Sequence, residues 1–354
     1  MASMRHIGPG TALAALLLLG AAPSMAAPFS ADYVFGDSLS DRGNAADALG
    51  HHFSTPPFFH DSFTNGPTAV QVMAQQLGLS ADPSLFPTGF ADPYGLGDTP
   101  GTNYAVAGAT AGNGAGVPGG NLASQIGAFL LHAGNVAPSS ALYTVFIGGN
   151  DVRTAAHTGD PSYVAQGVQA ELAGIGALIA AGARNLLVVN LPDIGVIPEF
   201  TLGYPSQAAT ATADSILYNQ GLASGVAAIA AADPAGNIKL FDLFDFNNAL
   251  LANAGSLGIT NTTQPCYLSY GSVTDNSPLV VNPACGPIDP TTNQAANIGQ
   301  FYYWDSIHPT AAVQAAYGNA LYAFEIATVP EPASAALLAA GLAGLARLRR
   351  RRPA

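Results

Sequence analysis

The stretch "YVFGDSLSDRGN", from Tyr33 to Asn44, decides how the rest of the chain is interpreted. An apolar run breaks into Gly-Asp-Ser and then into polar residues, which is the pattern of a buried strand that ends in a turn. Ser38 stands at that turn. Gly, Asp and Ser are ordinary turn residues, so the stretch alone leaves two interpretations open: a small turn residue or a nucleophile.

Strand-like and helix-like segments alternate along the chain. Short apolar runs predict core strands at residues 32–35, 102–106, 142–147, 185–190 and 238–242. Helical patterns cover residues 67–79, 122–134, 161–183, 210–232 and 309–327. This alternation predicts an α/β fold with a parallel sheet covered on both faces, whose active site lies beyond the carboxyl ends of the strands. Residues 50–100 and 253–300 break the alternation and are interpreted as insertions around that site.

Other motifs supply what a nucleophilic serine needs. In "FYYWDSIHPT", Asp305 and His308 are three residues apart, so the carboxylate can orient the imidazole while the imidazole takes the proton from Ser38. "NYAVAGATAG" follows the second predicted strand and offers a backbone N–H at Gly108. "FIGGND" follows the third and offers the side-chain amide of Asn150. Together with the backbone N–H of Ser38, these donors predict an oxyanion hole.

Four blocks, "FGDSLSDRGN", "NYAVAGAT", "IGGND" and "WDSIHPT", resemble in order and spacing those of the GDSL or SGNH hydrolase superfamily. The resemblance covers about residues 30–326, and "NLPDIGVIP" is similar to a secondary signature, as is Asn65-Gly66. It implies a flavodoxin-like three-layer α/β/α sandwich with a mainly five-stranded parallel sheet. The residues carried over, one per block, are Ser38, Gly108, Asn150 and His308, with Asp305 completing the triad. One departure is Ala107, which stands where the second block often has a first glycine.

The resemblance implies a serine esterase or lipase that cleaves carboxylic ester bonds and needs no cofactor and no metal. The sequence leaves open the acyl chain length, the alcohol, the choice between hydrolysis and acyl transfer, and the oligomeric state. The substrates expected are esters of lipids, simple alcohols or acetylated sugars. The alternatives are a polysaccharide O-acetylesterase or transacylase, and a non-catalytic polysaccharide-binding or matrix protein on the same fold. A binding module has no need of a base beside a hydroxyl.

Both ends of the chain have the character of targeting segments. Residues 1–26 have a weakly basic start, a short apolar run and a small-residue cleavage site, which predicts a signal peptide. Residues 329–354 combine Pro-Glu-Pro, a short apolar stretch and an arginine cluster, and resemble the PEP-CTERM sorting signal. The hydrolase domain then covers residues 27–328. The resemblance implies export through the inner membrane of a Gram-negative bacterium, and transient anchoring by the tail. It also implies cell-surface or extracellular localisation, with a sorting protease and the secretion machinery as partners.

Charge and cysteine content narrow the partners further. Between residues 27 and 330, four basic residues stand against 21 acidic ones, so this part of the chain repels nucleic acid and anionic membrane surfaces. Export permits disulfides, and Cys266 and Cys285 predict one bridge that closes a loop. The alternative is two unpaired thiols.

Two further clusters each have two interpretations. Residues His51, His52, His60 and Asp61 suggest a metal site, but their spacing matches no known ligand pattern, and a solvated loop is the alternative. Aromatic residues of the first insertion suit either an acyl-binding pocket or ordinary core packing: Phe58, Phe59, Phe63 and Tyr94.

Overall fold

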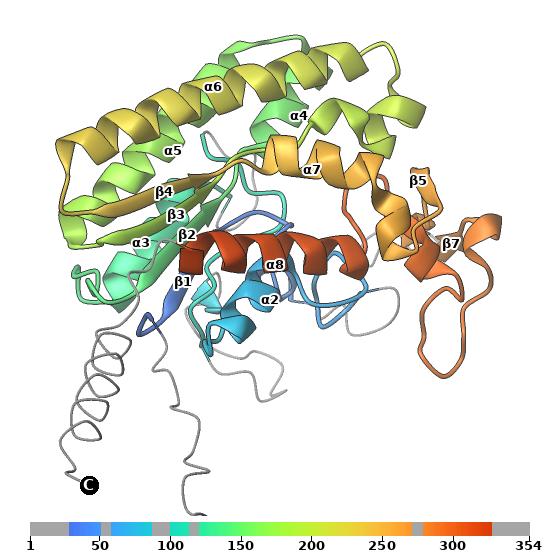
Figure 1. The fold of residues 1–354 in the computed structure, drawn as a ribbon, viewed down its shortest axis with the longest axis horizontal. Helices are drawn as coiled ribbons and strands as arrows, with labels where there is room; N and C mark the ends of the chain where they lie inside the picture. The colour runs from blue at the N-terminus through green and yellow to red at the C-terminus, as the bar shows by residue number, and fades with distance from the viewer. Residues whose placement is uncertain (1–27, 51–57, 87–99, 113–119, 271–278, 328–354) are drawn as a thin grey trace, which may run out of the picture.

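The computed structural model describes residues 28–50, 58–86, 100–112, 120–270 and 279–327 (Figure 1). The expected signal peptide and sorting tail lie outside these residues, as do parts of both insertions, including His51, His52 and Tyr94.

A parallel sheet forms the centre of the fold. Its strands follow one another in space as they do in sequence: β1 (Asp32–Gly36), β2 (Leu142–Phe146), β3 (Asn185–Val189) and β4 (Asn237–Phe241). All five residues of β2 are buried, as expected for a strand covered on both faces. The predicted strands over 32–35, 142–147, 185–190 and 238–242 therefore form as expected, to within a residue or two at each end.

The predicted strand over residues 102–106 takes a different form. It lies along the outer edge of β1, where Tyr104 N–H donates to the Val34 carbonyl at 2.7 Å, but it forms only an isolated bridge there. Its other edge is occupied by the loop before it, since Asn103 N–H donates to the Asp82 carbonyl. The outer backbone groups of this segment, which a regular strand would use to pair with another strand, are thus bonded to a loop. With this segment included, the order along the sheet is that of a flavodoxin-like fold, which the family resemblance implies.

Helices cover both faces of the sheet, which confirms the three-layer α/β/α class (Figure 1). One face carries α4 (Gly149–Thr158), α5 (Ser162–Ala181) and α6 (Ala208–Ala232), with α3 (Leu122–His132) packed between α5 and β1. On the other side α2 (Ala69–Gln76) packs against α8 (Ala311–Ala327). Short helices at the strand ends are α1 (Asn44–Leu49) and α7 (Leu243–Ala252). Single helical turns complete the described chain: Ile194–Val196, Glu199–Gly203, Ala254–Leu257, Pro283–Cys285 and Ile298–Gln300.

The helix α5 has the length and apolar composition of a membrane-spanning helix, but it packs within the fold. Ile175 and Leu178 on α5 are fully buried in the main core. Gly174 lets α3 approach so closely that a Cβ there would lie 2.8 Å from Leu122. The apolar composition of α5 is therefore that of a helix in a covering layer.

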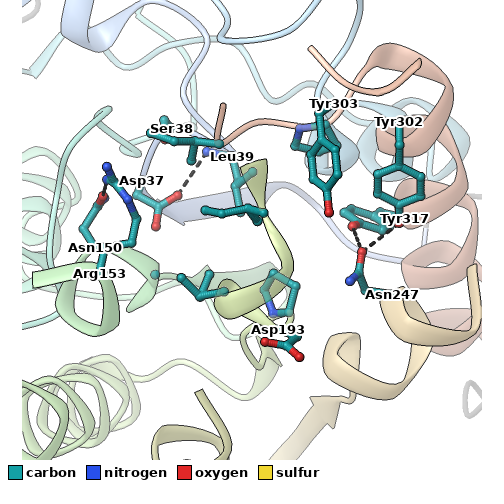
Figure 2. Close-up of a pocket in the computed structure, with 16 residues that line it drawn as sticks. Asp37, Ser38, Leu39, Asn150, Arg153, Asp193, Asn247, Tyr302, Tyr303 and Tyr317 are labelled. Atoms are coloured by element: carbon teal, nitrogen blue, oxygen red, sulfur yellow. Dashed lines mark hydrogen bonds between the residues drawn. The ribbon is translucent and has the colours of Figure 1, made fainter. Parts of the chain in front are cut away.

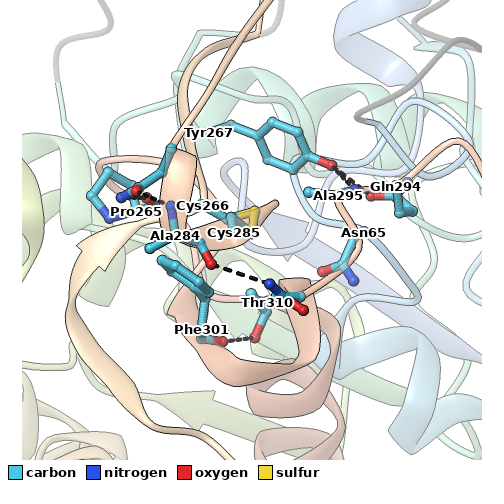
Figure 3. Close-up of a disulfide and its surroundings, with 12 residues drawn as sticks. Asn65, Pro265, Cys266, Tyr267, Ala284, Cys285, Gln294, Ala295, Phe301 and Thr310 are labelled. Atoms are coloured by element: carbon cyan, nitrogen blue, oxygen red, sulfur yellow. Dashed lines mark hydrogen bonds between the residues drawn. A yellow bond between two sulfur atoms is a disulfide. The ribbon is translucent and has the colours of Figure 1, made fainter. Parts of the chain in front are cut away.

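The second insertion folds into a small disulfide-bonded unit. Its strands are β5 (Asn261–Pro265), β6 (Tyr267–Tyr270) and β7 (Leu279–Val281), and β5 pairs with β8 (Phe301–Tyr303), the strand that leads to His308. Cys266 and Cys285 form a disulfide, as the sequence predicts (Figure 3). Tyr267 and Trp304 belong to the separate hydrophobic cluster around it. The insertion thus packs against the segment that carries the histidine.

A buried carboxyl group lies at the start of the sheet, away from the carboxyl ends of the strands. Asp32 on β1 is fully buried, and its Oδ1 accepts from the Thr144 hydroxyl at 2.8 Å. Its Oδ2 has no hydrogen-bond partner in the described part of the chain. The pKa of Asp32 is raised to about 7: burial raises it most, the bond from Thr144 partly offsets this, and the nearby Glu325 adds to the rise.

This pKa predicts a loss of stability as the pH rises. The folded protein holds the Asp32 proton more tightly than the unfolded chain, so the contribution is complete below pH 4 and is lost as the pH rises through 7. From pH 5 to pH 8, Asp32 should lower the free energy of unfolding by about 3 kcal/mol. Asp32→Asn should flatten this dependence in denaturant titrations at the two pH values. A variant whose pH dependence runs parallel to the wild type would contradict the assignment. Asp37, Asp41 and Asp151, whose pKa values are raised to about 6, contribute with the same sign in both proteins.

Candidate active site

Ser38 lies in a tight turn just past the end of β1. Asp37 fixes this turn, because its Oδ1 accepts from Leu39 N–H at 3.0 Å and its carbonyl accepts from Ser40 N–H and Asp41 N–H. Gly36 is required before it, since a Cβ there would lie 2.5 Å from the Phe146 carbonyl oxygen. Neighbouring β2 therefore leaves no room for a side chain at residue 36.

The structure brings Ser38, His308 and Asp305 together. His308 Nε2 lies 2.7 Å from Ser38 Oγ, and His308 Nδ1 lies 2.8 Å from Asp305 Oδ2. The second carboxylate oxygen of Asp305 accepts from the backbone N–H groups of Ile307 and His308. Asp305 and His308 are 3% and 4% exposed, so water competes little for these bonds. This chain of hydrogen bonds can carry a proton away from the serine hydroxyl.

Both insertions hold the turn that carries the histidine. From the second insertion, Cys266 N–H donates to the Tyr303 carbonyl and Tyr267 N–H donates to the Trp304 carbonyl. From the first, the Thr64 hydroxyl donates to the Pro309 carbonyl, while Asn65 Oδ1 accepts from Ala311 N–H. Across the turn itself, Thr310 Oγ1 donates to the Phe301 carbonyl (Figure 3). Asn65, which belongs to a secondary family signature, therefore caps the start of α8.

Two backbone N–H groups near Ser38 are free to bind an anion. In the described ranges, the N–H groups of Ser38 and Gly108 donate to no acceptor. Gly108 has a φ of +80°, the left-handed region that favours glycine. Ala107 N–H is instead bonded to Asp41 Oδ2 at 2.8 Å. The alanine at the first position of the second block thus leaves Gly108 as the free donor.

Buried carboxylates hold the loop that carries Gly108. Asp41 accepts four backbone N–H groups, from Gly43, Asn44, Ala45 and Ala107. Asp151 accepts two more, from Ala111 at 2.7 Å and Gly112 at 3.0 Å. Burial raises the pKa of Asp41 and that of Asp151 to about 6, while these backbone bonds lower both. The position of Gly108 therefore depends on acidic residues that never touch a substrate.

Asn150 lies in the first turn of α4, and its amide orientation is fixed from two sides. Asn150 Nδ2 donates to the Ala109 carbonyl at 2.8 Å. Asn150 Oδ1 accepts from Arg153 at 2.7 Å, and Figure 2 shows these two side chains together. Arg153 is held by Glu199 through two bonds of 2.6 and 2.7 Å. Glu199 N–H in turn donates to the Ser306 carbonyl in the turn before His308. A single network therefore joins the amide to the histidine turn.

Arg153 and Glu199 each favour the charged form of the other. Burial opposes the charge on Arg153, but the bonds to Glu199 outweigh it and raise the pKa of the guanidinium. Burial also works against the Glu199 carboxylate, yet Arg153 leaves the pKa of Glu199 below its usual value. Arg153 and Glu199 thus form a partly buried, bidentate ion pair, the geometry in which arginine holds a partner most rigidly.

Two hollows meet at Ser38. A small cavity of about 50 Å³ lies between the serine turn, the loop after β3 and the β8 segment (Figure 2). A larger groove of about 260 Å³ passes over Gly108 and His308. Phe63 borders this groove, whereas Phe58 packs against Trp304. Of the aromatic residues considered from the sequence, Phe63 thus faces the site and Phe58 packs in the disulfide cluster.

Some residues of the site escaped the sequence analysis. Arg153 follows Asn150 by three positions, a spacing that puts both on one side of a helix, but "GGND" was interpreted as a strand end without the helix α4. Glu199 belongs to the loop after β3 and meets Arg153 only in the folded chain. As for the metal hypothesis, the described residues include no group of three His, Cys, Asp or Glu side chains placed to hold an ion, and His51 and His52 are not among them.

Comparisons with known proteins agree with the motifs. Residues 33–321 match the GDSL-like lipase/acylhydrolase family, and residues 328–352 match the PEP-CTERM protein-sorting motif. Phosphatidylcholine-sterol acyltransferase of Aeromonas hydrophila is 25% identical over 81% of this chain and 88% of its own length. Esterase EstA of Pseudomonas aeruginosa is 30% identical over 94% of this chain. Thermolabile hemolysin of Vibrio parahaemolyticus is 26% identical over 78% of this chain.

The chain spans 53% of the length of the esterase and 59% of that of the hemolysin. The sorting motif indicates export to the cell surface of a Gram-negative bacterium. The family match covers the sheet from Tyr33 onward and every residue of the serine site, and the chain therefore belongs to the GDSL-like lipase/acylhydrolase family.

Proposed function

We propose that the chain hydrolyses carboxylic esters with Ser38 as the nucleophile. His308 takes the Ser38 proton as the hydroxyl attacks the ester carbonyl, and then returns it to the departing alcohol. Asp305 orients the imidazole and stabilises its protonated form. Water then attacks the acyl-enzyme by the same route and releases the acid. The single observation that carries this proposal is the hydrogen bond of 2.7 Å between His308 Nε2 and Ser38 Oγ.

Three donors stabilise the tetrahedral intermediate in this proposal: the backbone N–H groups of Ser38 and Gly108, and the Asn150 amide. The unbonded state of the two backbone groups supports their role, because Ser38 is partly exposed and Gly108 is exposed, and both border the groove, so their N–H groups are accessible to a substrate oxygen. A donor that is already oriented costs no reorganisation when the oxyanion forms. Non-catalytic binding gains nothing from this arrangement.

The nucleophile is tested with p-nitrophenyl butyrate. Ser38→Ala should lower kcat by at least about 10³-fold, because it removes the hydroxyl that is hydrogen-bonded to His308. Ser40→Ala is the matched control: Ser40 lies in the same turn, its hydroxyl has no hydrogen-bond partner in the described chain, and its loss should leave kcat within about twofold. Equal activity in the Ser38 variant and the wild type would contradict the proposal.

The oxyanion network gives a second prediction. Asn150→Ala should lower kcat by about 10²- to 10³-fold through loss of one donor. Arg153→Ala should lower kcat by roughly 10- to 100-fold, because the Asn150 amide is then free to turn away from the oxyanion. If Arg153 acts through Asn150, Arg153→Ala has little further effect in the Asn150→Ala background. Additive losses in the double variant would mean that Arg153 acts by another route.

Residues 1–26 and 329–354 are proposed to direct export, followed by transient anchoring and removal of the tail. The family match at residues 328–352 supports this, and the apolar stretch of the tail is shorter than the ~20 residues that a stable membrane span needs. Intact-mass analysis of the protein from a host with the sorting protease should find a mature chain that lacks the arginine cluster. A surface-exposed chain that still ends at Ala354 would contradict the processing step.

A further inference from the structure

Ser38 lies where two spaces of unequal size meet, and their borders differ in chemistry. Among the described residues, His308 and Gly108 border the larger groove and do not border the small cavity. Ile194 and Ile197 border the small cavity and do not border the groove. Ser38 and Asn150 border both. The proton donor for a leaving group therefore lies on the groove side.

This arrangement assigns the two halves of an ester. In the tetrahedral intermediate, the carbon bound to Ser38 Oγ also carries the oxyanion, the alcohol oxygen and the acyl substituent. The alcohol oxygen must lie near His308 Nε2, because that atom protonates it as the bond to carbon breaks. The alcohol thus extends into the groove, and the acyl substituent extends into the cavity. We infer that the small cavity receives the acyl group and limits it to about four carbon atoms, while the groove accepts large alcohols. This inference rests on the proposed esterase function.

The walls of the cavity set the size limit. The cavity volume of about 50 Å³ is about a fifth of the 260 Å³ of the groove, so the cavity suits only a short acyl group. Ile194 and Ile197 are 5% and 6% exposed, so neighbouring side chains pack against them and they cannot move aside to enlarge the cavity. Tyr303 crosses the cavity, and its hydroxyl donates to the Val196 carbonyl at 3.4 Å, which ties β8 to the loop after β3. Leu39, next to the nucleophile, forms the near wall (Figure 2).

The far end of the cavity is polar, which also disfavours a long chain. The Tyr302 and Tyr317 hydroxyls both donate to Asn247 Oδ1, and Asn247 is 3% exposed (Figure 2). Asn247 Nδ2 donates to no acceptor in the described part of the chain. An alkyl chain that reached this end would cover an amide donor without giving it an acceptor. Polarity and volume therefore favour the same substrates, from acetate to butyrate esters.

The full-length protein is tested on p-nitrophenyl acetate, butyrate, hexanoate and octanoate, each kept below its micelle concentration. The value of kcat/KM should be highest at acetate or butyrate and fall by about tenfold or more at octanoate, since one methylene that does not fit the cavity costs about tenfold or more. A profile that peaks at octanoate, or that is flat across the series, would overturn the inference.

Variants at each border separate the two spaces. Ile197→Ala should raise the octanoate-to-acetate ratio of kcat/KM by about tenfold. Ile194→Ala makes the same test if the first variant does not fold. Leu49→Ala, at an exposed position bordering the groove, is the matched control: it should leave the acyl ratio unchanged and alter KM for esters of bulky alcohols. An acyl ratio that responds to Leu49→Ala and not to either isoleucine variant would reverse the assignment.

Failure of this inference can be told apart from failure of the esterase proposal. Hydrolysis that depends on Ser38 but prefers long acyl chains refutes only the cavity assignment. If no ester is hydrolysed and a fluorophosphonate leaves Ser38 unlabelled in a folded protein, both proposals fall.

Discussion

The hydrogen bond between His308 Nε2 and Ser38 Oγ joins two turns that lie 270 residues apart in the chain, and much of the structure serves to hold those two turns in register. Ser38 is positioned by the sheet, because its turn begins where β1 ends and packs against β2. His308 is positioned by both insertions, through Thr64 and Asn65 on one side and the disulfide unit on the other. A shift of about 1 Å in either turn would break a bond of this length and cost catalysis steeply.

Buried carboxylates are the second recurring device. Asp41, Asp151 and Asp305 each accept backbone N–H groups from a loop of the site, and Asp37 does the same within the serine turn. Each fixes a loop of the site, so that irregular segments hold the groups proposed to be catalytic in place. The cost is the burial of acidic groups, seen in the raised pKa values of Asp37, Asp41 and Asp151. This chain has few basic residues, and backbone N–H groups therefore provide many of the hydrogen bonds to its buried carboxylates.

The sequence predicted the elements whose signals are local. Strands of the central sheet are short apolar runs, and Ser38, Gly108, Asn150 and His308 each stand in a recognisable motif at an expected place. It missed α4 and α7, because each is only ten residues long and contains few turns over which a helical period can be recognised. It also missed every feature that depends on contact between distant segments: the Arg153–Glu199 pair, the anchoring of the histidine turn, and the cavity formed by Ile197, Tyr303 and Asn247. Residues 102–106 were predicted as a strand, but the loop beside them takes their outer hydrogen bonds.

The central claim is that Ser38 is a nucleophile activated by His308, and covalent labelling tests it most directly. The folded protein is treated with a fluorophosphonate, digested, and the modified residue is located by mass spectrometry, with His308→Ala treated in parallel. The account predicts a single adduct on Ser38 in the wild type and labelling slowed by at least about 10²-fold in the variant, because an unactivated hydroxyl is a weak nucleophile. An unlabelled Ser38 in the wild type, or equal labelling of both proteins, would contradict it.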